Sequence, residues 1–213
     1  MRRRISCTQN VIAAKKVCDP RMDTVLIFDW DDTLLPTTWL QKSNLLQEEP
    51  KKQTDEQRDI LDGISTSVIT LLTEAQKYAT VKIVTNAQKG WVQSSCREFM
   101  PRCSALIESV PIFSARATYE WLYPDKPYMW KILAFQIVTI NYSQVISIGD
   151  TDAERLAALK LHDSLRIKTI KLEEMPAIET VARQLKMLPT VLGPIVVFEE
   201  NMDVFYDLEA SSE

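Results

Sequence analysis

The chain has few of the residues that build zinc sites or cysteine-dependent active sites. It contains a single histidine, His162, and its four cysteines form no CxxC pair. A tetrahedral zinc site or a Cys–His nucleophile is therefore difficult to assemble from this sequence. The cysteines fit reduced thiols, and we expect a cytoplasmic protein.

Long apolar runs are missing as well. No stretch reaches the roughly 18 to 20 apolar residues that a membrane helix needs, and no apolar segment resembles the centre of a secretion signal. An excess of positive charge is also absent, since the net charge is −4 over 213 residues. We therefore expect no stable membrane insertion and no nucleic acid as the main partner.

Basic residues are concentrated at the start of the chain. Five arginines and lysines precede Asp19, the first acidic residue. We predict a basic leader over residues 1–22, either a solvated segment or an organelle-targeting sequence. The length suits one catalytic domain, over residues 23–190. Residues 191–213 form a C-terminal extension that we expect to add an edge strand before it frays.

Segments typical of buried strands alternate with segments of helical periodicity. This alternation predicts an α/β fold with a doubly wound, Rossmann-like parallel sheet and helices on both faces. The expected strands are residues 25–28, 80–86, 104–115, 144–150 and 166–172. The expected helices are residues 60–78, with a start near Thr54 or Asp55, and residues 89–100, 128–140, 152–161 and 177–188.

Polar side chains stand where three of these strands end. The acidic ones are Asp29, Asp31 and Asp32 after the first strand, and Asp150, Asp152 and Glu154 after the fourth. The carboxyl ends of parallel strands meet at one edge of the sheet, so these side chains are expected to share a crevice. Neighbouring carboxylates raise each other's pKa values unless a cation neutralises them. An all-oxygen site of this kind favours Mg²⁺.

The spacing of the first acidic pair suits phosphoryl transfer. Asp29 and Asp31 are two residues apart, so both side chains can face one substrate. One carboxylate can attack phosphorus while the other donates a proton to the leaving oxygen. At the end of the second strand, Thr85 and Asn86 offer a hydroxyl and an amide for the phosphate oxygens.

These motifs, in this order, resemble those of the haloacid dehalogenase-like (HAD) phosphohydrolases with a minimal cap. The matching segments are Asp29-Trp30-Asp31-Asp32-Thr33, the strand that ends in Thr85, and Gly149-Asp150 with an acid after it. Glu154 occupies the position where the family usually has Asp. Asp152 therefore competes with Glu154 as the residue that binds metal water or supports the metal ligands.

The resemblance implies a role for each of these residues. Asp29 is expected to be the nucleophile that forms an aspartyl-phosphate, and Asp31 the general acid and base. The Asp29 carboxylate, the Asp31 backbone carbonyl and Asp150 are expected to hold Mg²⁺. Two lysines, Lys126 and Lys131, compete for the phosphate site. We favour Lys131, because a position on a helix fixes where the side chain points.

The family gains much of its substrate specificity from cap insertions, and here the candidate insertions, residues 39–54 and 115–127, are short. We expect an open mouth and a macromolecular substrate such as a phosphoprotein, with phosphotyrosine as one candidate. The aromatic residues between 119 and 130 and Arg116 are candidates for its docking surface, with ordinary packing as the alternative. Two other functions stay open: a small-metabolite phosphatase with a lid from a dimer partner, and a catalytically silent binding domain. The sequence does not specify an oligomeric state.

Overall fold

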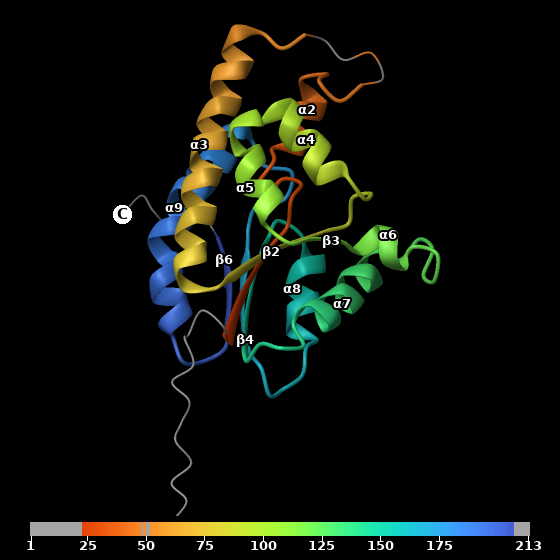
Figure 1. The fold of residues 1–213 in the computed structure, drawn as a ribbon, viewed down its shortest axis with the longest axis vertical. Coiled ribbons are helices and arrows are strands. Elements are labelled where there is room, and N and C mark those ends of the chain that lie inside the picture. Colours follow the sequence, from red (N-terminus) through yellow and green to blue (C-terminus); the bar gives the residue numbers. More distant parts are fainter. Residues whose placement is uncertain (1–22, 48, 50–51, 207–213) are drawn as a thin grey trace, which may run out of the picture.

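A six-stranded parallel sheet forms the centre of the computed structural model, which describes residues 23–47, 49 and 52–206 (Figure 1). The strand order is β3-β2-β1-β4-β5-β6, and all neighbouring strands are parallel. The fold is therefore the doubly wound, Rossmann-like α/β fold that the sequence predicts. The strands are β1 (Thr24–Phe28), β2 (Thr80–Thr85), β3 (Ile112–Ser114), β4 (Gln144–Gly149), β5 (Arg166–Lys171) and β6 (Met202–Phe205).

The strand order reverses beside β1. The chain first builds outward through β2 and β3, and then returns to the other side of β1 to build β4, β5 and β6. In such sheets the crevice at the reversal, at the carboxyl ends of the strands, is the usual ligand site. Strands β1 and β4 flank this crevice, so Asp29 and Asp150, the residues directly after them, lie at its base.

Strand β1 is apolar because it is covered on both faces. All five of its residues are buried, as expected for a central parallel strand. Alternate side chains enter the two cores: Leu26 and Phe28 join the core on one face, whereas Val25 and Ile27 join the core on the other. The apolar run directly before Asp29 is therefore the middle of the sheet.

Helices cover both faces of this sheet. Helices α3 and α9 pack against each other on one face, and α7 and α8 pack together on the other (Figure 1). None of the helices within the described ranges is both long and apolar enough to cross a membrane. The helices are α2 (Thr37–Lys42), α3 (Asp55–Tyr78), α4 (Trp91–Phe99), the 3-10 helix η1 (Pro101–Cys103), α5 (Ser104–Ser109), α6 (Ala115–Tyr119), α7 (Pro127–Val138), α8 (Asp152–Leu159) and α9 (Ile178–Val197).

The start of α3 is the one that the sequence predicts. Thr54 caps the helix, because its side chain accepts a hydrogen bond from the Gln57 backbone N–H and the Gln57 side chain binds the Thr54 N–H in return. This reciprocal pair satisfies two backbone donors that the first turn would otherwise leave free.

Residues 104–115, predicted as one strand, divide into two elements, so this prediction is wrong. Residues Ser104–Ser109 form helix α5, and strand β3 begins only at Ile112, after Pro111. The apolar residues Leu106 and Ile107 gave the segment its strand-like composition. Ile107 is buried from a helix, in the core that lies under α3.

The C-terminal part of the chain stays packed against the sheet. Helix α9 continues through the boundary that the sequence suggested at residues 190 and 191, and it contains Pro189 and Pro194. The chain then adds β6 as a parallel edge strand beside β5. The predicted leader, residues 1–22, and the last segment, residues 207–213, lie outside the described residues.

A buried lysine fixes the end of α9. Lys168 lies in β5 with no exposed surface, and its ammonium donates hydrogen bonds to the backbone carbonyls of Ile195, Val196 and Phe198. It also donates to the Gln144 side chain over 2.9 Å. The last carbonyls of a helix have no partner within the helix, so a cation placed there satisfies them and interacts favourably with the helix dipole.

We expect Lys168→Met to lower the free energy of unfolding by about 3 kcal/mol, because it leaves the Ile195 and Phe198 carbonyls without the ammonium donor, while the Val196 carbonyl keeps the Gln144 amide. Urea unfolding followed by circular dichroism measures this loss. Lys160→Met, at an exposed position after α8, is the matched control and should change stability by less than about 0.5 kcal/mol. Equal losses in the two variants would contradict the capping role of Lys168.

Candidate active site

The end of β1 is held against the end of β4. The Asp29 backbone N–H donates to the Ile148 carbonyl over 3.0 Å, so the ladder between the two strands extends to the first acidic residue. Asp29 itself is buried, with 6% of its surface exposed. Its carboxylate therefore points from a fixed backbone position into the crevice.

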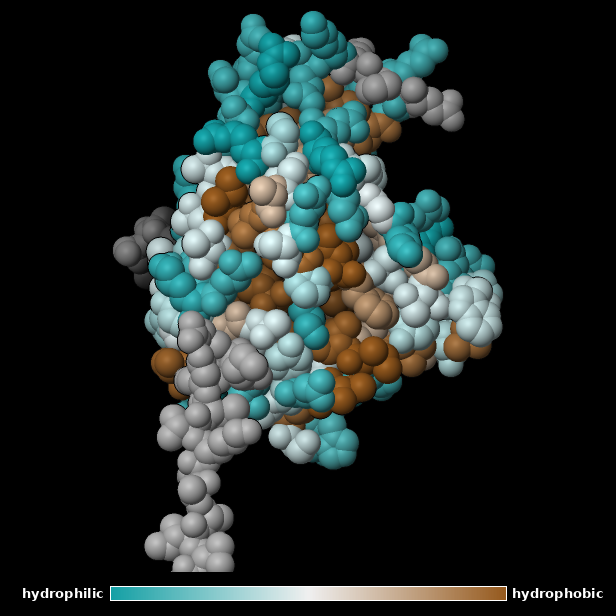
Figure 2. Space-filling model, in the orientation of Figure 1, coloured by the Kyte–Doolittle hydropathy of each residue, from teal (hydrophilic) through white to brown (hydrophobic). Residues whose placement is uncertain are grey.

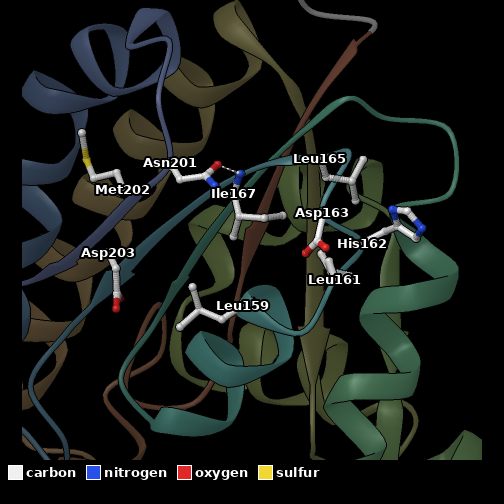
Figure 3. Close-up of a pocket in the computed structure, with 9 residues that line it drawn as sticks. All are labelled: Leu159, Leu161, His162, Asp163, Leu165, Ile167, Asn201, Met202 and Asp203. Atoms are coloured by element: carbon white, nitrogen blue, oxygen red, sulfur yellow. Dashed lines mark hydrogen bonds between the residues drawn. The ribbon is translucent and has the colours of Figure 1, made fainter.

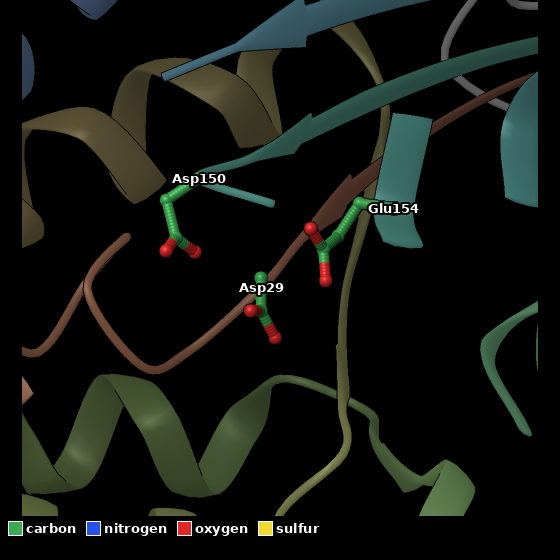
Figure 4. A group of neighbouring side chains, drawn as sticks. All are labelled: Asp29, Asp150 and Glu154. Atoms are coloured by element: carbon green, nitrogen blue, oxygen red, sulfur yellow. The ribbon is translucent and has the colours of Figure 1, made fainter. Parts of the chain in front are cut away.

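Three buried carboxylates gather in this crevice (Figure 4). Asp29, Asp150 and Glu154 each contribute an oxygen to a group whose members all lie within 4.8 Å of one another. Asp29 follows β1, Asp150 follows β4, and Glu154 projects from the first turn of α8. The sequence predicted a crevice shared by Asp29, Asp31 and Asp150 with either Asp152 or Glu154, and the topology of the sheet brings Asp29 and Asp150 together with Glu154.

Lys131 enters the cluster from α7. It is 1% exposed, its ammonium lies 2.8 Å from the Asp29 carboxylate, and it forms a second ion pair with Glu154. Lys126, the competing candidate, is an exposed residue immediately before α7. The helix thus places Lys131, and not Lys126, beside the carboxylates, as the sequence argument favoured.

Glu154 has several partners at once. One carboxylate oxygen binds Lys131, and the other accepts hydrogen bonds from the Thr151 backbone N–H and hydroxyl in a capping box. Gly149 makes room for this side chain, because a Cβ atom at position 149 would lie 2.6 Å from the Glu154 Cγ. With these partners, Glu154 is suited to position Lys131.

Asp152 lies outside the cluster. Its side chain is 61% exposed and lies 3.6 Å from the Arg155 guanidinium, at the surface of α8. The structure therefore separates the two acids that competed in the sequence: Glu154 faces the crevice and Asp152 faces solvent.

Burial sets the pKa values of these groups. It raises the pKa of Asp29 well above the usual range, even though Lys131 opposes this, and it raises that of Asp150 to about 7, with the nearby Glu154 adding to the effect. Burial also disfavours ionised Glu154, but Lys131 and the Thr151 hydrogen bonds outweigh it, so the pKa of Glu154 is lowered. The pKa of Lys131 is raised, because its two carboxylate partners outweigh its burial. One ammonium thus faces three carboxylates, and the site favours a further cation.

Asp31 lies in the segment that follows β1 and is not part of the group of three carboxylates. Its Oδ1 accepts hydrogen bonds from the Thr37 hydroxyl over 2.7 Å and from the Trp91 indole N–H over 2.9 Å. Between the two aspartates, Trp30 is fully buried and donates to Ser95, so its side chain points away from the crevice. Among the described residues, no group donates a hydrogen bond to Asp31 Oδ2.

A tight turn connects β1 to α2 and carries Asp32. Asp32 adopts a left-handed backbone conformation, with φ of 54°, which Asp tolerates better than most residues. Its carboxylate accepts hydrogen bonds from the Thr38 backbone N–H and hydroxyl, and its backbone N–H binds the Leu35 carbonyl. Thr33, from the same turn, donates to Asp150 over 3.3 Å. The turn therefore fixes both Asp31 and Asp150.

The end of β2 supplies Thr85 and Asn86. Thr85 is buried; its hydroxyl oxygen accepts from the Ala87 N–H, and it donates to no described residue. Asn86 donates its amide to the Pro127 carbonyl, at the first residue of α7. Thr85 thus keeps a donor for a ligand, whereas Asn86 connects β2 to the helix that carries Lys131.

Three residues that support the site were not predicted from the sequence. These are Thr37 and Trp91, which bind Asp31, and Lys171, whose ammonium donates to the Asp150 backbone carbonyl. Lys171 is a strand residue, and only its burial at the end of β5 distinguishes it from an ordinary surface lysine. Tryptophan and threonine carry no motif at these positions, so the sequence offered no signal for them.

The aromatic residues proposed as a docking surface divide into two groups. Trp130 is buried, and Tyr119 and Tyr123 pack partly against the core on the α7 face. Trp121 and Tyr128 are exposed, at 78% and 49%. Only these two are therefore available to a partner on the described surface.

A hollow of about 230 Å³ lies away from the crevice, near the starts of β5 and β6 (Figure 3). It is bordered by the segment between α8 and β5 and by the start of β6, and His162 is among its lining residues. The His162 ring nitrogen accepts a hydrogen bond from the Ser164 N–H. Of the described residues, only Asp29, Asp150 and Glu154 are grouped closely enough to hold a metal ion, and none of them lines this hollow.

No protein-family model matches this chain, and no curated protein or solved structure gives a significant match.

Asp150 should make the metal-free protein less stable as the pH rises. Its pKa is about 7 in the folded protein against an ordinary value of 3.8, so the folded state holds this proton more tightly. This contribution is complete below pH 3.8 and is lost as the pH rises through 7. With EDTA present, the free energy of unfolding of the wild type should fall by about 2 to 3 kcal/mol more than that of Asp150→Asn between pH 5 and pH 7. Urea titrations with parallel pH dependence in the two proteins would contradict this assignment.

Substitution of Glu154 should lower the free energy of unfolding much more than substitution of Asp152, the other acid in the first turn of α8. Glu154→Gln removes one of the two carboxylates that neutralise buried Lys131, and we expect a loss of about 3 kcal/mol in unfolding free energy. Asp152→Asn changes an exposed side chain and should cost less than about 0.5 kcal/mol. Thermal and urea unfolding of both variants measure this difference, and the opposite ranking would show that Asp152 is the structural acid.

Proposed function

We propose that this protein is a Mg²⁺-dependent phosphomonoester hydrolase that acts through an aspartyl-phosphate on a macromolecular substrate, in the manner of the HAD phosphohydrolases that its motifs resemble. The observation that carries the proposal is the convergence of Asp29, Asp150 and Lys131 in one buried crevice, with Asp31 beside it. All of them lie where a doubly wound sheet binds ligands.

The donor set fits a hard divalent cation. The crevice offers only oxygen ligands, and its carboxylates exceed its single ammonium. The Asp29 and Asp150 carboxylates, with the Asp31 backbone carbonyl, would hold Mg²⁺. When bound, the ion would neutralise these carboxylates and the charge of an incoming phosphate.

Asp29 is the proposed nucleophile because its backbone is fixed and its carboxylate faces the crevice. One of its oxygens attacks phosphorus, which forms an acyl-phosphate bond as the ester P–O bond breaks. The leaving oxygen takes a proton from Asp31. Lys131, whose ammonium lies 2.8 Å from Asp29 Oδ1, holds the nucleophile in place and offsets the charge of the phosphoryl group.

Asp31 then acts in the reverse sense. A water molecule gives a proton to Asp31 and attacks phosphorus, and the bond between phosphorus and Asp29 breaks to release inorganic phosphate. The hydrogen bonds from Thr37 and Trp91 to Oδ1 keep the carboxylate oriented, which leaves Oδ2 for proton transfer. The Thr85 hydroxyl is free to donate to a phosphate oxygen.

The short insertions support a large substrate. Helix α2 has six residues and α6 has five, and these are the helices that occupy the two positions where the family carries a cap. A site with so little cover cannot enclose most of a small metabolite, as small-ligand pockets do. We therefore propose a phosphoprotein as substrate, with phosphotyrosine as the first residue to test.

Hydrolysis of p-nitrophenyl phosphate tests the reaction directly. The wild type should release p-nitrophenol in the presence of Mg²⁺ and lose this activity in EDTA. Asp29→Asn should reduce turnover to background. Asp31→Asn should lower it by about 10² to 10⁴-fold, because the water that hydrolyses the aspartyl-phosphate loses its general base. Asp62→Asn, at an exposed position of α3, is the control for an aspartate substitution and should keep full activity.

A panel of phosphopeptides and small phosphometabolites tests the substrate class. We expect higher kcat/KM values for phosphotyrosine peptides than for the small esters. Efficient turnover of a small metabolite with weak action on every peptide would instead favour the metabolite phosphatase that closes by dimerisation. Mg²⁺ binding without turnover of any ester would favour the silent binding domain.

A further inference from the structure

A hollow of about 520 Å³ lies beside the candidate active site. It is formed by the segment between β2 and α4, by the first turn of α4, and by Arg116 from α6. In the orientation of Figures 1 and 2, the outline of the molecule is indented just above the lobe that contains α6. The residues that line the hollow are Ala87, Gln88, Lys89, Gly90, Trp91, Ser94 and Arg116.

Two of the lining residues donate hydrogen bonds to candidate active-site residues. Trp91, which lines the hollow, donates its indole N–H to the Asp31 carboxylate over 2.9 Å. Ala87, on the same wall, donates its backbone N–H to the hydroxyl of Thr85. The hollow therefore adjoins Asp31 and Thr85, and a substrate whose phosphoryl group reaches Asp29 can extend into it.

The hollow carries positive charge. Lys89 and Arg116 line it, and no carboxylate is among its lining residues. Lys89 forms no ion pair with any described residue. The Arg116 guanidinium is held by two hydrogen bonds, of 3.0 and 2.9 Å, to the Glu120 carboxylate one helical turn away. One cation is thus free, and the second is preoriented by a partner outside the hollow.

We propose that this hollow binds an acidic side chain of the phosphorylated protein, close in sequence to the phosphoresidue that Asp29 attacks. The inference rests on the proposed phosphatase function and narrows its substrates to phosphorylated sites with an acidic neighbour. Lys89 supplies the attraction, and Arg116 supplies donors that a carboxylate can share with Glu120. The volume suits one side chain and part of its backbone.

The charge of the whole chain favours a short acidic segment over a polyanion. The net charge is −4, so a nucleic acid would meet repulsion from the rest of the surface. At physiological ionic strength, a single carboxylate responds mainly to charges within a Debye length of about 8 Å. A carboxylate bound in the hollow would lie within this distance of Lys89 and Arg116, which line it.

Paired phosphotyrosine peptides test the inference. Each pair differs by Glu or Gln at one position within three residues of the phosphotyrosine, and kcat/KM is measured for both members. At one or more positions, Glu should raise kcat/KM of the wild type by about fivefold, the size expected for contacts with partly exposed charges. The Glu-to-Gln ratio should fall toward one in the Lys89→Gln and Arg116→Gln double variant, and in 0.5 M NaCl.

Two further variants sharpen the result. Glu120→Gln releases Arg116 from its internal partner, so the Glu-to-Gln ratio should rise above the wild-type value. Lys160→Gln removes an exposed lysine that does not line the hollow, and it should leave the ratio unchanged.

The experiment distinguishes a failure of this inference from a failure of the proposed phosphatase function. If the wild type hydrolyses p-nitrophenyl phosphate and the peptides but shows a ratio of one at every position, the inference is wrong and the phosphatase function stands. A preference for Glu that survives the double variant also overturns it, because another surface then reads the acid. No phosphate release from any ester overturns both proposals.

Discussion

The ion pairs of Lys131 hold the site together. Asp29, Asp150 and Glu154 lie within a few ångströms of one another in a buried crevice, and such a group repels itself unless a cation stands among them. Lys131 supplies that cation from α7, and the hydrogen bond from Asn86 to Pro127 ties the first residue of this helix to the end of β2. The packing of α7 therefore sets the electrostatics of the crevice. One ammonium still leaves the cluster negative, which is why the site suits a divalent ion.

The segment after β1 presents two carboxylates to different partners. On the β4 side, the turn after Phe28 presents Asp29 to Asp150 and Glu154, where charge neutralisation dominates. On the α4 side it presents Asp31 to Thr37 and Trp91, where hydrogen bonds orient a carboxylate that is only half-buried. Trp30, buried between the two, anchors the turn through Ser95. One strand end thus presents one carboxylate to a charged cluster and another to neutral hydrogen-bond donors.

The sequence was most informative where chemistry and periodicity agree. The fold and the meeting of Asp29 with Asp150 follow from apolar runs that end in acids, and the start of α3 follows from a capping residue, Thr54, ahead of a helical pattern. The sequence favoured Lys131 over Lys126, because a position on a helix fixes where the side chain points. The choice of Glu154 over Asp152 needed the structure, because it depends on which face of α8 turns inward. Residues 104–115 were misread, since a short apolar helix such as α5 has the composition of a strand. The roles of Lys168 and Lys171 could not be predicted from the sequence. The hydrogen bonds that define these roles go to backbone carbonyls, which every residue type has.

The pairing of β1 with β4 also fixes when the site can form during protein synthesis. Thr24 lies beside Gln144, 120 residues later in the chain, and Lys131 and Glu154 are made equally late. At about 5 to 20 residues per second, a ribosome needs roughly 6 to 24 s to cover that distance. During this interval one edge of a strand whose residues are all buried in the folded protein lacks its partner, and Asp29 has no lysine beside it. The nascent chain is then at its most prone to aggregation, and it is the stage at which a chaperone has most to protect.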